Sequence, residues 1–197
     1  MKKTLQEVRE YINEGVYDPG IFKAFFLAGG PGSGKTFVTS SAFAGTGLKL
    51  VNSDIKFERD LRKANLSLKM PDEEAYFRDI IRKGAKAFVG KQLDQYLKGR
   101  LGMIIDSTAR DYSVIQRQYN LLRNIGYDCY MVFVNTSLDV ALERNRTRSR
   151  SIPEYIVQKS WKGVQANMGA FQKVFGHSKM LIVDNNKDDK ELATQTL

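Results

Sequence analysis

The sequence predicts an α/β fold: a three-layer sandwich of about five mostly parallel strands with helices on both faces of the sheet. The first observation behind this prediction is that short apolar runs alternate with longer amphipathic stretches along the 197 residues. Such alternation is typical of parallel strands joined by crossover helices. The second observation is a glycine-rich segment, residues 29–36, between the first apolar run and the helix expected after it.

Residues 29–36 match a complete G-x-x-x-x-G-K-[ST] motif. These residue types suit a polyphosphate, because glycine adopts the backbone angles that point several N–H groups inward. Lys35 can reach the β- and γ-phosphates, and Thr36 can offer its hydroxyl to Mg²⁺. The motif therefore predicts a fold of the P-loop NTPase type that binds ATP or GTP. The expected phosphate contacts are Gly30, Pro31, Gly32, Ser33, Gly34, Lys35 and Thr36.

The other elements follow from apolar runs and from the residues that end them. Glycines stop several expected helices, as Gly99 and Gly126 do, and Ser137 has the side chain of an N-cap. Strands are expected at residues 22–28, 48–52, 101–105, 127–134 and 180–183. Helices are expected at residues 36–44, 55–69, 112–125 and 153–175, from a break at 70–74 to about 98, and from 137 onward.

Composition limits the class of protein. The length fits one domain, residues 1–197, with an N-terminal helical extension over residues 1–20 that includes a helix at 4–14. The net charge of +9 favours anionic partners and admits nucleic acid among them. No apolar run approaches 18 residues, so no membrane span is expected. The single cysteine, Cys129, excludes a disulfide framework and, together with an N-terminus unlike a signal peptide, favours a cytoplasmic setting.

Two aspartates follow apolar strands. Because the carboxyl ends of parallel strands meet at one edge of a sheet, Asp54 and Asp106 should lie beside the glycine-rich loop. Asp106 is a candidate Mg²⁺ ligand of the Walker-B kind, and Asp54 is a candidate base that accepts the proton of a hydroxyl. The alternative for each aspartate is to cap the following helix, and a cap and a base are compatible roles.

An arginine-rich segment at about 144–152 is a candidate lid. Its members Arg144, Arg146, Arg148 and Arg150 are spaced by two residues, so one helix face cannot present all of them. Some are therefore expected to project from a loop, where arginine suits the charge on a transferring phosphoryl group. The alternative is a solvated basic patch.

Four segments resemble the P-loop kinases that include the zeta toxins and the polynucleotide 5′-hydroxyl kinases. They are residues 29–36, 52–54, 106–110 and 144–153, within a resemblance over about 22–184. The resemblance implies that Asp54 is the catalytic base and that lid arginines contact ATP. We accordingly assign Arg144 and Arg148 to catalysis and Arg146 to nucleotide binding.

The segment after the third long strand is similar to the acid-Gly-Thr-Gly-Arg stretch of the zeta toxins. This similarity implies that Asp106, Thr108 and Arg110 contact the substrate, and it competes with Mg²⁺ binding by Asp106. Ser107 and Ala109 replace the glycines of that stretch, so this loop has less conformational freedom.

A second departure concerns the residue that holds a substrate phosphate. Polynucleotide kinases place an arginine three residues after the base, whereas this chain has Phe57 there, with Lys56 beside it. The departure weakens the polynucleotide interpretation. Lys56 is the substrate-binding candidate at this place.

Together these residues predict a Mg²⁺-dependent kinase that transfers the γ-phosphate of ATP to a hydroxyl group. The expected acceptor is nucleotide-like: a sugar nucleotide, a nucleoside or a polynucleotide 5′ end. The alternatives are a nucleic-acid-stimulated P-loop ATPase and a nucleoside monophosphate kinase. A monophosphate kinase transfers to a phosphate, which needs no base, so an essential Asp54 counts against it.

Overall fold

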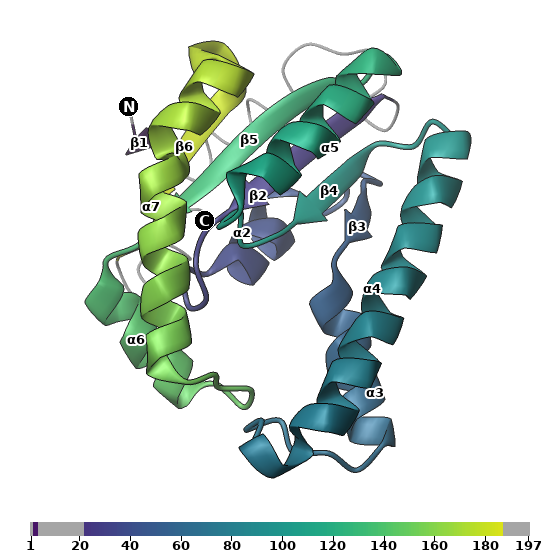
Figure 1. Ribbon diagram of the computed structural model, residues 1–197. Helices are drawn as coiled ribbons and strands as arrows, with labels where there is room; N and C mark the ends of the chain where they lie inside the picture. The colour runs from purple at the N-terminus through teal and green to yellow at the C-terminus, as the bar shows by residue number, and fades with distance from the viewer. Residues whose placement is uncertain (1, 4–21, 187–197) are drawn as a thin grey trace.

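The computed structural model describes residues 2–3 and 22–186, and a six-stranded sheet forms its centre (Figure 1). The strand order is β1-β6-β5-β2-β4-β3, and all neighbours are parallel. The strands are β1 (Lys2–Lys3), β2 (Lys23–Ala28), β3 (Lys49–Val51), β4 (Met103–Asp106), β5 (Asp128–Asn135) and β6 (Met180–Asp184). The five strands predicted from the apolar runs are confirmed, and the two-residue β1 extends the sheet beside β6.

Helices connect the strands, as the alternation predicts. They are α2 (Lys35–Ala42), α3 (Ser53–Lys63), α4 (Ala75–Lys98), α5 (Tyr112–Asn124), α6 (Leu138–Thr147) and α7 (Glu154–Phe175), with 3₁₀ turns η1 (Asp72–Glu74) and η2 (His177–Lys179). The predicted N-terminal helix, residues 4–14, lies outside the described residues. None of the helices in the described part of the chain has an apolar stretch sufficient to span a bilayer.

Helices cover both faces of the sheet, which confirms the three-layer prediction. On one face β2 and β5 pack against α5 and α7, and the rings of Phe26 and Phe175 lie 5.3 Å apart. On the other face, Val38 and Ala42 of α2 pack against the opposite sides of the same strands. Every residue of β2 is buried, which explains why its sequence is nearly all apolar instead of alternating.

Helices α3 and α4 form a hairpin that projects beyond the β3 edge of the sheet (Figure 1). Phe57 and Leu61 of α3 are fully buried with Ala85 of α4, and they form a small core of their own. The loop between α6 and α7, residues 148–153, faces this hairpin across the carboxyl ends of the strands (Figure 1). The site lies between them.

The end of α3 differs from the prediction. The helix stops at Lys63 instead of about residue 69, because Asn65 adopts a left-handed φ of 55°. The amide of Leu66 then donates to the carbonyl of Leu61 at 2.9 Å and closes the helix. Asparagine visits this conformation more readily than most residues, so the local sequence contained the signal.

Candidate active site

The phosphate-binding loop leads from β2 into α2 around two left-handed glycines. Gly32 has a φ of 81° and Gly34 a φ of 87°, angles that favour glycine. A Cβ atom on Gly32 would lie 2.3 Å from the carbonyl oxygen of Ala141, and one on Gly34 would lie 2.0 Å from Nδ2 of Asn185. Gly32 is therefore required for steric as well as backbone reasons, whereas at Gly34 the close atom belongs to a side chain and the backbone angle is the main constraint.

Two buried side chains hold the backbone of this loop. The carbonyl of Ser33 accepts from Oγ1 of Thr136 at 3.1 Å and from Nδ2 of Asn185 at 2.8 Å. Nε1 of Trp161 donates in turn to the carbonyl of Thr136 at 2.7 Å. The hydroxyl of Ser33 is buried without a hydrogen-bond partner in the described chain, so an anion in the loop would supply the acceptor that it lacks.

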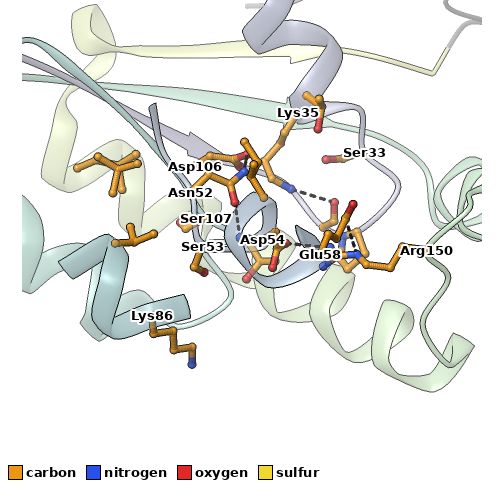
Figure 2. A pocket seen from close by; sticks show the side chains of 18 of the residues that line it. Ser33, Lys35, Asn52, Ser53, Asp54, Glu58, Lys86, Asp106, Ser107 and Arg150 are labelled. Atoms are coloured by element: carbon orange, nitrogen blue, oxygen red, sulfur yellow. Dashed lines mark hydrogen bonds and ion pairs between the residues drawn. The ribbon is translucent and has the colours of Figure 1, made fainter. Parts of the chain in front are cut away.

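Lys35 reaches back across the loop from the start of α2 (Figure 2). Its Nζ donates to the carbonyl oxygens of Gly29 at 2.7 Å and of Gly30 at 3.3 Å. Burial lowers the pKa of Lys35, whereas the charges of Asp106 and Asp54 raise it. The ammonium group therefore lies within electrostatic reach of both aspartates.

Asn52 joins the two aspartates at the ends of β3 and β4 (Figure 2). Its Oδ1 accepts from the amide of Asp54 at 2.7 Å, so Asn52 is the N-cap of α3. Its Nδ2 donates to Oδ2 of Asp106 at 2.6 Å. The capping alternative is therefore wrong for Asp54, and it is wrong for Asp106 too, because Asp111 caps α5.

Two arginines hold the carboxylate of Asp54. Nη1 of Arg82, on α4, lies 2.6 Å from Oδ1, and Nη2 of Arg150, in the loop after α6, lies 3.0 Å from Oδ2. Burial alone would raise the pKa of Asp54, but the hydrogen bonds and charges of Arg150 and Arg82 outweigh it and lower the pKa to about 2. Asp54 is therefore an anion at neutral pH.

The pKa of Asp106 shifts in the opposite direction to that of Asp54. Burial raises its pKa, and the charge of Asp54 adds to the rise, while Lys35 and Asn52 favour the ionised form. The two aspartates thus have different environments although each follows an apolar strand. One is paired with two guanidinium groups, and the other accepts from an amide beside an ammonium group.

These side chains line one cavity of about 1270 Å³ between the phosphate loop, α3, α4 and the loop after α6. Several candidates from the sequence line it: Gly30, Pro31, Gly32, Ser33, Gly34, Lys35, Thr36, Asp54, Asp106, Thr108, Arg144 and Arg148. The structure thus brings the loop, both aspartates and two lid arginines into one place.

Three other candidates do not line the cavity. Arg146 pairs with Glu154 at the surface, with Nε 2.6 Å from Oε1. Lys56 pairs with Asp60 one turn further along α3. The side chain of Arg110 packs against α7 at Gly163. This arrangement gives no support to the contacts predicted for these three residues.

The side chains without an assigned role that line the same cavity include Asn52, Glu58, Arg82 and Lys86. The local sequence could have indicated Asn52 and Glu58 as site residues, because asparagine favours N-caps and Glu58 is one helical turn from Asp54. The local sequence does not indicate Arg82 and Lys86, since their position in the cavity depends on how α4 packs against α3.

The loop after β4 adopts the conformation that glycine would favour. Ala109 has a φ of 55°, at a position where the zeta-toxin stretch has glycine. Nδ2 of Asn167 donates to the carbonyl of Ala109 at 3.2 Å, and the amide of Gly29 donates to the carbonyl of Thr108 at 3.4 Å. These bonds hold the loop against α7 and the phosphate loop in spite of the unfavourable φ.

The donors around the loop fit a polyphosphate with a divalent cation. Within the described residues, no group of three or more His, Cys, Asp or Glu side chains forms a metal cluster. Mg²⁺ does not require one, because it binds through one or two protein oxygens together with phosphate and water. The hydroxyl of Thr36 and the carboxylate of Asp106, which both line the cavity, suit this role.

The fold and the loop define a P-loop protein with a kinase-like fold. A family model described as AAA_33, AAA domain, matches residues 25–171, and the chain therefore belongs to this family. No curated protein matches the chain.

Solved structures share the fold at low identity. AvrRxo1-ORF1 in complex with ORF2 and ATP is 14% identical with a TM-score of 0.65, and the match covers 92% of this chain and 61% of that chain. The PezAT toxin–antitoxin system of Streptococcus pneumoniae is 16% identical, with a TM-score of 0.58 and coverage of 92% and 76%. A gluconokinase from Sinorhizobium meliloti is 17% identical, with a TM-score of 0.52 and coverage of 90% of each chain.

These likenesses confirm the predicted fold type, and they extend to P-loop kinases beyond the zeta-toxin and polynucleotide types. The present chain spans less than two thirds of the AvrRxo1-ORF1 chain.

Proposed function

We propose that the protein is a kinase that transfers the γ-phosphate of ATP to a hydroxyl of a nucleotide-like acceptor. One observation carries the proposal. The carboxylate of Asp54 is kept anionic by Arg82 and Arg150 in the same cavity as Lys35 and the phosphate loop. Transfer to a hydroxyl uses a carboxylate placed in this way, whereas transfer to a phosphate does not.

The donor side of the reaction uses the loop. The backbone amides of residues 30–36 and the ammonium of Lys35 bind the β- and γ-phosphates. The AvrRxo1-ORF1 structure with ATP supports ATP as the donor. Thr36 and Asp106 would hold Mg²⁺, which supplies positive charge to the phosphate oxygens when bound.

In the transfer, the acceptor oxygen forms a bond to the γ-phosphorus while the bond from that phosphorus to the bridging oxygen breaks and ADP leaves. The hydroxyl proton passes to a carboxylate oxygen of Asp54. Since the pKa of Asp54 is about 2, the carboxylate is a weak base. Its main role is therefore to orient the hydroxyl and to accept the proton late, when the attacking oxygen has become acidic.

The lid arginines act on the phosphoryl group. Arg144 and Arg148 line the cavity from α6 and from the residue after it. Nη1 of Arg144 also donates to the carbonyl of Asn185 at 2.9 Å, which keeps the guanidinium beside the phosphate loop. Their positive charges stabilise the transferring group and help to exclude water.

The acceptor end of the cavity supports a phosphate-bearing acceptor. Arg59, Arg62 and Lys86 line it, and none of the three forms an ion pair with another described residue. Cations without an ion-pair partner that line a cavity attract anionic ligands and can hydrogen-bond to phosphate oxygens. A sugar nucleotide or an oligonucleotide fits these charges better than an uncharged nucleoside.

The test is transfer of labelled γ-phosphate from ATP to panels of sugar nucleotides, nucleosides, nucleoside monophosphates and 5′-hydroxyl oligonucleotides. Asp54→Asn should lower transfer by about 10²–10⁴-fold while ATP affinity stays nearly unchanged. Asp60→Asn is the matched control, because Asp60 lies on the same helix outside the cavity lining. Lys35→Ala should weaken ATP binding in a calorimetric titration.

Other outcomes would replace the proposal. Full transfer activity in Asp54→Asn would remove Asp54 as the base. Label on the phosphate of a monophosphate acceptor would indicate a nucleoside monophosphate kinase. Hydrolysis of ATP stimulated by DNA or RNA, without a labelled acceptor, would indicate an ATPase.

A further inference from the structure

Arg150 crosses the cavity from the loop after α6 to the first turns of α3 (Figure 2). Its Nη2 lies 3.0 Å from Oδ2 of Asp54, and its Nε lies 2.9 Å from Oε1 of Glu58. Asp54 and Glu58 are one helical turn apart, so their carboxylates lie on the same face of α3. A single guanidinium group therefore bonds two carboxylates at once, and the planar fork fixes its orientation.

A neighbouring ion pair differs from this contact both in its exposure and in the elements that it joins. Arg146 and Glu154 also form an arginine–glutamate pair, but it joins α6 to the start of α7 and does not reach α3. The side chain of Arg146 is 62% exposed, whereas that of Arg150 is 14% exposed. An exposed pair is mobile and screened, while the side chain of Arg150, which is mostly buried and bonded to two carboxylates, is held in one geometry.

The third nitrogen of Arg150 has no partner. Nη1 is buried, and no described residue accepts a hydrogen bond from it. A buried charged donor without an acceptor is costly, so the two ion pairs of Arg150 have to offset that cost. Arg150 lines the same cavity as the phosphate loop, and its charge is among those that act on the ammonium of Lys35.

We propose that Arg150 is a positioning residue: it ties the loop after α6 to α3 and holds the Asp54 carboxylate in one orientation. This inference rests on the proposed function. Because one guanidinium bonds both carboxylates of α3, the position of the loop after α6 and the alignment of the base change together. Arg150 then affects the rate of transfer more than the affinity for either substrate.

The kinetic test compares Arg150→Ala, Arg150→Lys and Glu58→Gln with Glu154→Gln, which breaks only the surface pair. Arg150→Ala should lower kcat by about 10²-fold, with less than a tenfold change in ATP affinity. Arg150→Lys should recover less than tenfold of that loss, since an ammonium cannot bond two carboxylates at once as a planar fork does. Glu58→Gln should lower kcat several-fold, and Glu154→Gln should leave it within twofold.

A second measurement does not depend on activity. Hydrogen exchange of residues 148–153 should become several-fold faster in Glu58→Gln, although the substitution is on α3. Asp60→Asn, also on α3 but outside the cavity lining, should leave that exchange unchanged. Thermal unfolding of each variant checks that it folds.

The results separate this inference from the proposed function. Unchanged exchange of residues 148–153 in Glu58→Gln, or unchanged kcat in a folded Arg150→Ala, would overturn the role of Arg150. Retained transfer in Asp54→Asn would overturn the base, while the exchange result would still decide whether Arg150 ties the loop to α3.

Discussion

The two halves of the cavity are held together by different interactions. The donor half, residues 29–36, is fixed by buried hydrogen bonds, such as those from Thr136 and Asn185 to the carbonyl of Ser33. The acceptor half, formed by α3, α4 and the loop after α6, is joined by ion pairs on Asp54, whose side chain is 46% exposed. Ion pairs near water are screened by salt and compete with other charges, whereas buried bonds are not.

This difference has a consequence for function. A donor half built from backbone groups, neutral side chains and the buried Lys35 suits one ligand type, a polyphosphate, in one geometry. An acceptor half built from charged side chains can exchange one anionic partner for another. A substrate phosphate can therefore compete for Arg82, whose side chain is 32% exposed and which holds α4 to Asp54, while the less exposed Arg150 keeps the loop after α6 in place.

The largest effect is expected in the donor half, from Gly32→Ala. The new Cβ would lie 2.3 Å from the backbone oxygen of Ala141, and the φ of 81° is unfavourable for alanine. The clash is with backbone, so α6 would have to move. We expect a loss of about 4 kcal/mol in the free energy of unfolding, together with loss of ATP binding, as measured by denaturant unfolding and calorimetry.

Gly47→Ala is the matched control, because Gly47 has a φ of 73° but nothing within 4 Å of its Cβ position. This substitution should cost only the backbone strain, about 1 kcal/mol, and leave ATP affinity unchanged. Equal losses in the two variants would mean that the close approach to α6 is unimportant.

A smaller effect is expected in the acceptor half, from Phe57→Leu. Phe57 is fully buried, and the guanidinium carbon of Arg82 lies 3.6 Å from its ring centroid. Loss of the ring removes packing and a cation–π contact, so the free energy of unfolding should fall by about 2 kcal/mol. Phe88→Leu, at a ring that is 42% exposed beside Lys56, should cost less than about 1 kcal/mol. A larger loss at Phe88 would contradict the role of the small core under α3.

The sequence predicted the donor half more completely than the acceptor half. The phosphate loop is eight consecutive residues, and its constraints are local: backbone angles, a preceding strand and a following helix. The ends of β3 and β4 can also be located from the sequence, so Asp54 and Asp106 could be placed at the same edge of the sheet. Parallel strands then bring them together without further information.

The acceptor half depends on contacts between distant segments. Arg82 and Arg150 meet Asp54 only after α4 and the loop after α6 have packed around α3. Lys56 is predicted to bind the substrate because it is next to Phe57, where polynucleotide kinases have an arginine. However, Lys56 and Asp54 are two residues apart on a helix, so their side chains point in different directions. Helical geometry favoured Glu58 instead, and the structure places Glu58 in the cavity.

A still smaller effect, which depends on pH, is expected for the stability of Arg82→Gln. Removing this cation should raise the pKa of Asp54 from about 2 towards its ordinary value, while Arg150, Lys35 and Asp106 still act on it. Because the lowered pKa favours the folded state, the pairing stabilises the protein above about pH 4 and is lost as pH falls through about 2. Since Asp54 is half exposed, the difference at neutral pH should be below about 1 kcal/mol.

The measurement for Arg82→Gln is thermal unfolding from pH 7 to pH 2.5. The gap between wild type and variant should narrow as the pH falls. Arg78→Gln is the control, because Nη1 of Arg78 bonds the carbonyls of Met70 and Pro71, which do not titrate. A gap that is independent of pH in both variants would contradict the pairing of Arg82 with an ionised Asp54.

The smallest effect is expected at Arg146, and it separates the two kinds of lid arginine. Arg146 lies outside the cavity lining in an exposed pair with Glu154, so Arg146→Gln should leave the melting temperature unchanged and change ATP affinity by less than twofold. Arg148 lines the cavity, so Arg148→Gln should weaken ATP binding about tenfold, as measured by calorimetry. If both variants lost affinity equally, Arg146 would have to turn towards the phosphates when the nucleotide binds, and the surface pair would be a feature of the free protein alone.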